Sequence, residues 1–299
     1  MKRKLLFLIN PISGTRTKSR LKKKIADKCE QAGFAFEIRP TSREGQYDYL
    51  REMIQGEGLT DIVICGGDGS IRPVIAATLG LPVRIGIIPL GSGNGLAFSA
   101  TIPVSFDKAF GVIERGHTAP TDVFYVNQTL SCMLCGIGLD AKVARDFSHH
   151  KRRGLSTYVK ETLKNFFSAD SYPVTLIWKD QRVDLDAYFL SVANGNQFGN
   201  HFTIAPEASL SDGLLDIVVV KSRQKARTML SLLFHIRSGK TSQPQEGIKP
   251  EKDILYFQTD RIRLLNPRRA PLHIDGDYSP TSEELEIEVS PAAYTLLVP

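Results

Sequence analysis

The sequence contains no apolar run of the roughly 18–20 residues that a membrane-spanning helix needs. The beginning of the chain resembles a signal peptide only superficially. Its apolar run covers Leu5–Ile9 and ends in Asn10-Pro11, without a small-residue cleavage site. These absences predict a cytoplasmic protein that contacts membranes only peripherally.

Several motifs with well-defined chemistry are also missing. The P-loop pattern G-x-x-x-x-G-K-[ST] is absent. So is the dinucleotide fingerprint G-x-G-x-x-G, because Gly91-Ser92-Gly93 continues as Asn94-Gly95. Neither H-E-x-x-H nor G-x-S-x-G occurs. The chain is therefore not a P-loop, dinucleotide-fingerprint, H-E-x-x-H or G-x-S-x-G enzyme.

Cysteine is scarce, with four residues at Cys29, Cys65, Cys132 and Cys135. The last two form a C-x-x-C, but no second pair and no histidines at ligand spacing accompany it, so the sequence does not predict a zinc site. We expect buried cysteines that behave as small hydrophobes in a reducing compartment.

The composition is that of an ordinary globular protein, with 42% hydrophobic and 23% charged residues among 299. The net charge is +6, from 38 Lys and Arg against 32 Asp and Glu. A mildly basic chain favours anionic partners, such as nucleotides, acidic lipid surfaces or nucleic acid. No nucleic-acid motif appears, and aromatics do not alternate with the basic runs, so we expect no nucleic-acid partner.

The pattern of elements predicts two domains that differ in their secondary structure. Short apolar runs alternate with helical segments through the first 120 residues, which indicates an α/β domain with a parallel sheet. Residues 121–290 read as mostly antiparallel strands. The predicted strands of the first part are Lys4–Ile9, Phe34–Ile38, Asp61–Cys65 and Val83–Ile88, and the helices are Lys18–Gln31, Gln46–Ile54 and Ile71–Leu79. The predicted strands of the second part are Asp122–Val126, Val174–Trp178, Ala187–Ala193, Leu215–Val220 and Leu285–Val289. A helix is predicted over Leu155–Phe167 and a loop over Ser238–Lys252.

Three glycine-rich turns each follow a predicted strand: Asn10–Gly14, Gly66–Ser70 and Gly91–Gly95. The carboxyl ends of parallel strands meet at one edge of a sheet, where ligands bind. Glycine lets the backbone approach a phosphate and expose its N–H groups. Together the turns predict a polyphosphate cradle. Asp68, between glycines, is expected to bind Mg²⁺ or to accept a proton from an attacking hydroxyl.

Two acidic turns stand out in the second part, Ser211–Asp216 and His273–Asp277. An Asp-Gly pair by itself predicts a hairpin turn. The second turn has a carboxylate on each side of Gly276, which suits metal binding or general-base chemistry.

Two basic segments have competing interpretations. The cluster from Arg16 to Lys24 is mostly a solvated helix face, although one or two residues near the helix start are within reach of a phosphate. Lys151–Arg153 precede the amphipathic segment Leu155–Phe167. That segment is interpreted either as an interdomain helix or as a contact with an anionic membrane surface.

In their order and spacing, these turns resemble the diacylglycerol kinase catalytic-domain family, which includes bacterial lipid kinases and sphingosine kinases. The resemblance spans nearly the whole chain, and it implies a phosphofructokinase-like α/β domain over 1–120, which residues 291–299 complete, and a β-sandwich lipid-substrate domain over 121–290. It implies ATP as co-substrate, bound in the cleft between the domains, together with Mg²⁺, a membrane lipid substrate and a peripheral membrane surface. The oligomeric state is left open, with a homodimer among the arrangements allowed.

The resemblance also implies the site residues. The ATP contacts are Asn10, Pro11, Ile12, Ser13, Gly14, Thr41, Gly66, Gly67, Asp68, Gly69, Ser70, Ile71, Arg72 and Ser92. Ser209, Asp212 and the Leu214 carbonyl are the Mg²⁺ ligands. The general base is Asp277, where the family usually has Glu, or else Asp68.

The implied reaction is transfer of the γ-phosphoryl group of ATP to a lipid hydroxyl, with diacylglycerol as the first candidate acceptor. Gly95 replaces the Asp that bacterial diacylglycerol kinases usually have, which keeps a sphingoid base or another long-chain lipid open. An NAD kinase-like enzyme shares Gly-Gly-Asp-Gly, and a non-catalytic nucleotide-binding protein is the alternative from outside the enzymes.

Overall fold

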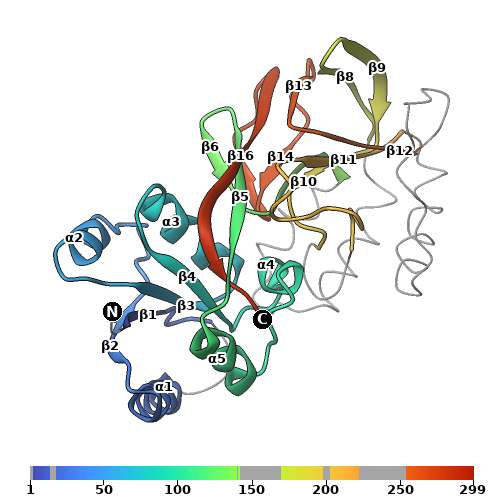
Figure 1. Ribbon diagram of the computed structural model, residues 1–299. Coiled ribbons are helices and arrows are strands. Elements are labelled where there is room, and N and C mark those ends of the chain that lie inside the picture. The colour runs from blue at the N-terminus through green and yellow to red at the C-terminus, as the bar shows by residue number, and fades with distance from the viewer. Residues whose placement is uncertain (1–2, 14–17, 140, 142–169, 198–202, 222–253) are drawn as a thin grey trace. The chain divides into compact units, whose positions relative to one another are not determined.

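The computed structural model describes residues 3–13, 18–139, 141, 170–197, 203–221 and 254–299 (Figure 1). The chain divides into two compact units, residues 1–121 with 292–299 and residues 122–291. The predicted helix 155–167, its basic run 151–153 and the predicted loop 238–252 lie outside the described residues. None of the helices in the described ranges is long and apolar enough to span a bilayer.

A parallel sheet forms the centre of the first unit, as predicted. Its strands lie in the order β2-β1-β3-β4. Their bounds are β1 (Lys4–Ile9), β2 (Ala35–Pro40), β3 (Asp61–Gly66) and β4 (Arg84–Pro89). The end of the last strand, β16 (Glu284–Leu297), belongs to this unit and pairs in parallel with β4 through Thr295 and Leu296. Strands β1, β3 and β4 are almost entirely buried, which accounts for their continuous apolar runs.

Helices cover both faces of this sheet, with α1 and α5 on one face and α2 and α3 on the other (Figure 1). Their bounds are α1 (Lys18–Ala32), α2 (Tyr49–Gln55), α3 (Asp68–Thr78), α4 (Gly95–Ser99) and α5 (Phe106–Arg115). Helix α3 begins at Asp68 rather than at the predicted Ile71, because extended Gly67 caps it directly after β3. Helices α4 and α5 were not predicted, although α5 buries Phe106, Ala109, Phe110 and Ile113 at helical spacing.

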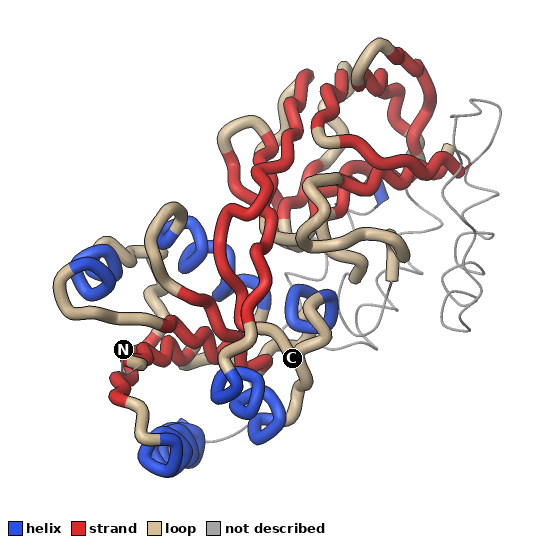
Figure 2. Tube along the Cα trace, in the orientation of Figure 1, coloured by secondary structure: helices blue, strands red, loops and turns tan. Residues whose placement is uncertain are grey.

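The described part of the second unit is strand and loop almost throughout (Figure 2), which confirms the prediction of a mostly antiparallel domain. One antiparallel sheet has the order β12-β11-β10-β7-β14-β15. The strands of this sheet are β7 (Leu134–Gly138), β10 (Phe189–Ala193), β11 (Leu215–Val220), β12 (Ile254–Thr259), β14 (Leu272–Ile274) and β15 (Asp277–Ser279). The other strands are β5 (Thr118–Val126), β6 (Thr129–Ser131), β8 (Tyr172–Trp178), β9 (Gln181–Ala187) and β13 (Arg261–Leu265).

The core of the second unit forms between these strands. Strand β13 and the first half of β16 alternate exposed and buried residues, which is the pattern of strands with one face in water. The Trp178 and Phe257 rings stack within the core at a centroid distance of 4.5 Å. Cys132 and Cys135 are buried thiols, like Cys29 and Cys65 in the first unit, as the sequence predicted.

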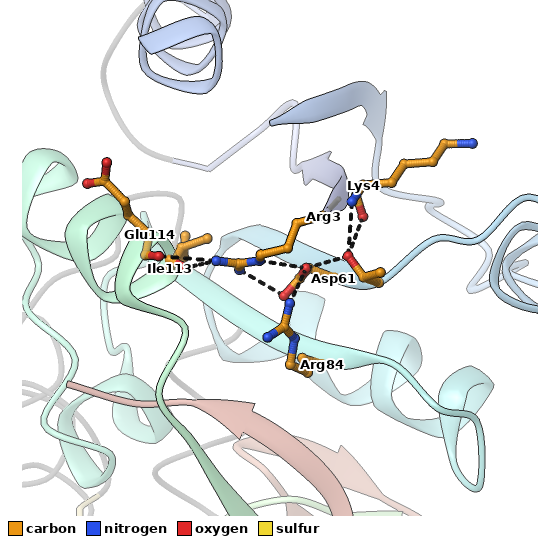
Figure 3. Close-up of polar contacts among 7 residues, drawn as sticks. Arg3, Lys4, Asp61, Arg84, Ile113 and Glu114 are labelled. Carbon is orange, nitrogen blue, oxygen red and sulfur yellow. Dashed lines mark hydrogen bonds and ion pairs between the residues drawn. The ribbon is translucent and has the colours of Figure 1, made fainter. Parts of the chain in front are cut away.

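Asp61, at the start of β3, is fully buried between two arginines (Figure 3). Arg3 donates to its carboxylate through Nε at 3.1 Å and Nη2 at 2.9 Å, and Arg84 through Nη2 at 2.8 Å. Arg3 also donates to the Ile113 carbonyl at 2.6 Å, near the C-terminal end of α5. This network joins the amino-terminal ends of the central strands to a helix terminus, where a cation is favourable.

We predict that Asp61→Asn lowers the free energy of unfolding by about 3 kcal/mol, because it leaves two partly buried guanidinium groups without their counter-charge. Urea unfolding measures the change.

The matched control is Glu57→Gln, which removes an exposed ion pair with Lys4 (2.8 Å) and is expected to cost less than about 1 kcal/mol. Equal effects of the two substitutions would contradict a special role for the buried network.

Candidate functional site

The loops after four parallel strands meet at one edge of the first unit's sheet. Main-chain hydrogen bonds join them in strand order: Thr41 N–H to the Ile9 carbonyl (3.0 Å), Asn10 N–H to the Cys65 carbonyl (3.0 Å) and Leu90 N–H to the Gly66 carbonyl (2.8 Å). The three glycine-rich turns predicted from the sequence therefore lie side by side, with Thr41 after the neighbouring strand β2.

Asn10 connects the first turn to the second. Its Oδ1 accepts the Ile12 N–H at 3.0 Å, and its carbonyl accepts the Ser13 hydroxyl at 3.2 Å. Its Nδ2 donates to the Ser70 hydroxyl at 2.8 Å. Asn10 thus shapes its own turn and fixes it to the start of α3, while Gly14 lies outside the described residues.

The second and third turns are packed backbone against backbone. A Cβ on Gly91 would lie 2.5 Å from the Gly67 Cα, and one on Gly67 would lie 2.8 Å from the Gly91 Cα. A Cβ on Gly66 would lie 2.7 Å from the Ser70 hydroxyl oxygen. These glycines are required by the lack of space, since none of the three has a positive φ.

Asp68 closes the junction between these two turns. Its Oδ2 accepts the Gly95 N–H at 3.0 Å and its Oδ1 accepts the Leu96 N–H at 3.2 Å, at the start of α4. Asn94 precedes them in the left-handed region (φ 55°), and its side chain pairs with the main chain of Gly91 at 2.8 and 2.9 Å. The sequence did not predict that Asp68 holds a helix start.

The remaining predicted nucleotide contacts differ in exposure. Pro11, Ile12 and Ser92 are exposed on the loops, Gly69 is exposed in the first turn of α3, and Arg72 is half-buried. Ile71 is 2% exposed, so its side chain belongs to the core and only its backbone belongs to the turn.

In the second unit, the Asp275–Asp277 turn separates its two carboxylates. Asp275 and Gly276 both have positive φ (51° and 83°) and join β14 to β15 as a two-residue hairpin turn. Asp275 turns back toward β6 and β7 and accepts from the Ser131 hydroxyl and from the main-chain N–H groups of residues 132, 133 and 134, at 2.7–3.2 Å. Asp277 is exposed. The two acids therefore lie in different surroundings, one held by main-chain N–H groups and the other exposed.

The Asp212 turn rests on a second, buried carboxylate. Asp212 Oδ1 accepts the Leu214 N–H at 3.0 Å, while Gly213, at φ 71°, donates its N–H to Asp122 Oδ2 at 2.8 Å. Burial raises the pKa of Asp212, and the charge of Asp122 raises it further. Asp122 was not predicted as a site residue, although an acid at the head of an apolar strand is an available signal.

The donors at this turn fit Mg²⁺. Mg²⁺ binds through one or two carboxylates together with carbonyl or water oxygens. Ser209 accepts the Ser211 N–H at 3.4 Å and so lies on the same turn. In the described part of the chain, no three His, Cys, Asp or Glu side chains are grouped as a metal site. A cation here would depend on carbonyl and water oxygens beside Asp212, and it would relieve the repulsion from Asp122.

Asp216 follows the Asp212 turn and lies in the buried strand β11. It is fully buried, accepts from the Tyr256 hydroxyl and contacts Gln258 Nε2 at 3.2 Å. Burial raises the pKa of Asp216 to about 6, although the hydrogen bond from Tyr256 lowers it. Burial also raises the pKa of Tyr256, as does the charge of Asp216. Tyr256 accepts the Glu207 N–H at 3.3 Å, so the cluster anchors the loop before the Asp212 turn.

Gly91→Ala is expected to lower the free energy of unfolding by about 2 kcal/mol, because the new methyl group overlaps the Gly67 backbone. Thermal and urea unfolding measure it.

Gly69→Ala is the control, since a Cβ there meets nothing within 4 Å and an exposed helix position gains from alanine. A destabilisation by Gly69→Ala that matches that of Gly91→Ala would contradict the close-contact explanation.

Asp216 predicts a pH dependence of stability. Its folded-state pKa lies above its ordinary value of 3.8, so its contribution to stability is complete below about pH 4 and is lost as the pH rises through about 6. The loss is on the order of 2–3 kcal/mol.

Urea unfolding of the wild type and of Asp216→Asn tests this pH dependence. It is measured between about pH 4 and about pH 8, at intervals of about one pH unit. The stability of the wild type relative to the variant should fall as the pH rises. A difference that stays constant with pH would show that Asp216 does not titrate in this range.

Two family models match consecutive parts of the chain. Residues 4–126 match the diacylglycerol kinase catalytic domain, and residues 134–298 match the YegS C-terminal NAD kinase beta sandwich-like domain. The diacylglycerol kinase of Staphylococcus carnosus is 24% identical over 282 residues, which cover 93% of this chain and 90% of that protein. The probable lipid kinase YegS-like of Cronobacter sakazakii is 23% identical over 275 residues, which cover 89% of this chain and 87% of that protein.

Solved structures show the same fold. The crystal structure of a diacylglycerol kinase from Bacillus anthracis str. Sterne matches with a TM-score of 0.73 at 22% identity, covering 99% of this chain and 97% of that chain. Another structure from that organism matches with a TM-score of 0.80 at 21% identity, covering 100% and 97%. The chain therefore belongs to the lipid kinase family in which a diacylglycerol kinase catalytic domain precedes a YegS C-terminal domain.

Proposed function

We propose that this lipid kinase transfers the γ-phosphoryl group of ATP to the hydroxyl group of diacylglycerol at a membrane surface. The observation that supports it best is the junction of Asn10, Gly67, Gly91 and Asp68, which brings three glycine-rich turns onto one sheet edge. Phosphoryl transfer depends mainly on positioning and on neutralising charge. In this proposal residues 1–120, completed by 291–299, bind the nucleotide and residues 121–290 bind the lipid.

The nucleotide phosphates are proposed to lie over the turns Asn10–Gly14, Gly66–Arg72 and Gly91–Ser92. Helix α3 begins within the second turn, and its positive dipole end favours an anion there. Because Gly67 and Gly91 have no side chains, the main-chain groups of the second and third turns are proposed to face the phosphates. Mg²⁺ would neutralise the charge on the phosphates. A structural Mg²⁺ is proposed at Asp212, Ser209 and the Leu214 carbonyl.

Asp277 is proposed as the general base that accepts the proton of the lipid hydroxyl. Two observations favour it over Asp68. Both Asp68 oxygens already accept α4 N–H groups, which suits a positioning role, whereas Asp277 is exposed directly after a two-residue hairpin turn. The Asp277 side chain is one methylene shorter than the Glu that the family usually has. The position of its carboxylate therefore depends on the backbone of the hairpin that carries it.

A sphingoid base or another long-chain alcohol is the second candidate acceptor. The observation in its favour is Gly95, which is buried and contributes only its N–H to Asp68. Bacterial diacylglycerol kinases usually have an Asp carboxylate at this position, and its absence here keeps a different lipid acceptor open. An NAD kinase-like activity and non-catalytic nucleotide binding are outcomes that the same assay separates.

The deciding experiment is phosphate transfer from labelled ATP with Mg²⁺ to a lipid panel in mixed micelles. The panel contains diacylglycerol, a sphingoid base and ceramide, and products are identified by mass spectrometry. A phosphorylated diacylglycerol supports the proposal, and a phosphorylated sphingoid base supports the second candidate. Phosphorylation of NAD alone, or ATP binding without any product, would reject lipid transfer.

Asp277→Asn and Asp68→Asn are expected to fail in different ways in this assay. Asp277→Asn should lower kcat by about 100-fold or more with KM for ATP nearly unchanged, because only proton acceptance is lost. Asp68→Asn should also raise KM for ATP and lower Tm, because the amide accepts α4 N–H groups through one oxygen only.

Asp260→Asn is the control, an exposed acid of the second unit outside the proposed site. Asp277→Asn with wild-type kcat would reject its assignment as the base.

A further inference from the structure

Lys18 lies on the apolar face of its helix. Leu21, Ile25 and Cys29 follow it at three, seven and eleven residues, which is the spacing of one helix face, and all three are buried. The other basic residues of the first two turns, Arg20 and Lys22–Lys24, are exposed. The sequence assigned most of this basic cluster to a solvated face, and Lys18 is the exception.

The ammonium group of Lys18 points back to the first glycine-rich turn. It donates to the main-chain carbonyl of Ser13 and lies 3.5 Å from the Ser13 hydroxyl oxygen. Ser13 in turn donates to the carbonyl of Asn10, the residue that fixes this turn to Ser70. Lys18 therefore contributes a positive charge to the junction of turns described above.

This charge has no anionic partner within the described ranges of the chain. Each ion pair found there involves another cation, and burial lowers the pKa of Lys18. Lys18 is half-buried, and a partly desolvated cation is stabilised when an anion accompanies it. A lysine ammonium has three N–H donors and only one is needed for the Ser13 carbonyl, so others remain for a ligand.

We propose that Lys18 binds the phosphate chain of ATP and neutralises part of its charge. This role rests on the proposed function and extends it with a residue outside the glycine-rich turns. A phosphate is the ligand that the geometry favours, because the ammonium group lies against the turn whose backbone approaches the phosphates. The competing explanation is a purely structural one, in which Lys18 only ties the helix start to the Ser13 carbonyl.

The test of the Lys18 role compares a ligand that carries phosphates with one that has none. Binding of ATP and of adenosine is measured by displacement of a fluorescent ATP analogue from the full-length protein, for the wild type, Lys18→Gln, Lys18→Arg and Lys23→Gln. Lys18→Gln keeps a donor for the Ser13 carbonyl and removes the charge. Lys23, exposed on the opposite side of α1, is the matched control.

Lys18→Gln is expected to weaken ATP binding by about tenfold or more, the range of a charge-assisted hydrogen bond, with adenosine binding unchanged. Lys18→Arg should restore ATP binding to within about threefold, and Lys23→Gln should match the wild type. An equal loss for both ligands, or no loss for ATP, would overturn the phosphate role. If Lys18→Gln does not fold, Lys18→Met, which suits an apolar face, takes its place.

The failure of this role and that of the proposed function are distinguishable. A wild type that binds no ATP would overturn the proposed function and the Lys18 role together. A wild type that binds ATP, with Lys18→Gln binding it equally well, would overturn the Lys18 role alone.

Discussion

The close approach of Gly67 and Gly91 is the constraint on which the proposed nucleotide site depends. Two loops that follow neighbouring parallel strands can pack backbone against backbone only if neither has a side chain at the contact. Asp68 then reaches the N–H groups that begin α4, and Asn94 closes its own turn around Gly91. The result is a surface of closely packed main-chain groups, and main-chain N–H groups in such turns can form anion-binding sites.

The two edges of the parallel sheet differ in how their charged residues are paired. At the amino-terminal edge, buried Asp61 is fully engaged by Arg3 and Arg84, so the network stabilises the fold and presents no chemistry. At the carboxyl-terminal edge, Asp68 and Lys18 lie beside main-chain groups on exposed loops. The register of the β1–β3 and β3–β4 pairs is fixed because both faces of these strands are buried, and this register sets the positions of the loops at both edges.

The acids of the second unit divide into supporting and exposed groups. Asp275, Asp122 and Asp216 accept hydrogen bonds from backbone or side-chain donors and fix the loops around them. Asp212 and Asp277 lie on those loops and are exposed. Each exposed acid thus sits on a turn held by a supporting one, which is the arrangement that positions a reactive group without burying it.

The sequence by itself determined the central strands of the first unit, the antiparallel character of the second and the candidate turns, because period, burial and glycine placement are local properties of the chain. Its residue pattern did not separate the roles of Asp275 and Asp277, which are two residues apart, and only the family resemblance singled out Asp277. Nor did the pattern reveal that Asp68 holds the start of α4. It also left open which residues near the start of the basic helix lie close to the first glycine-rich turn, where the structure places Lys18. Only the tertiary structure decided these points, because hydrogen bonds such as Asp68 to Gly95 and Asp275 to Met133 join residues far apart in sequence. Such pairings depend on strand order and register, which no local pattern encodes.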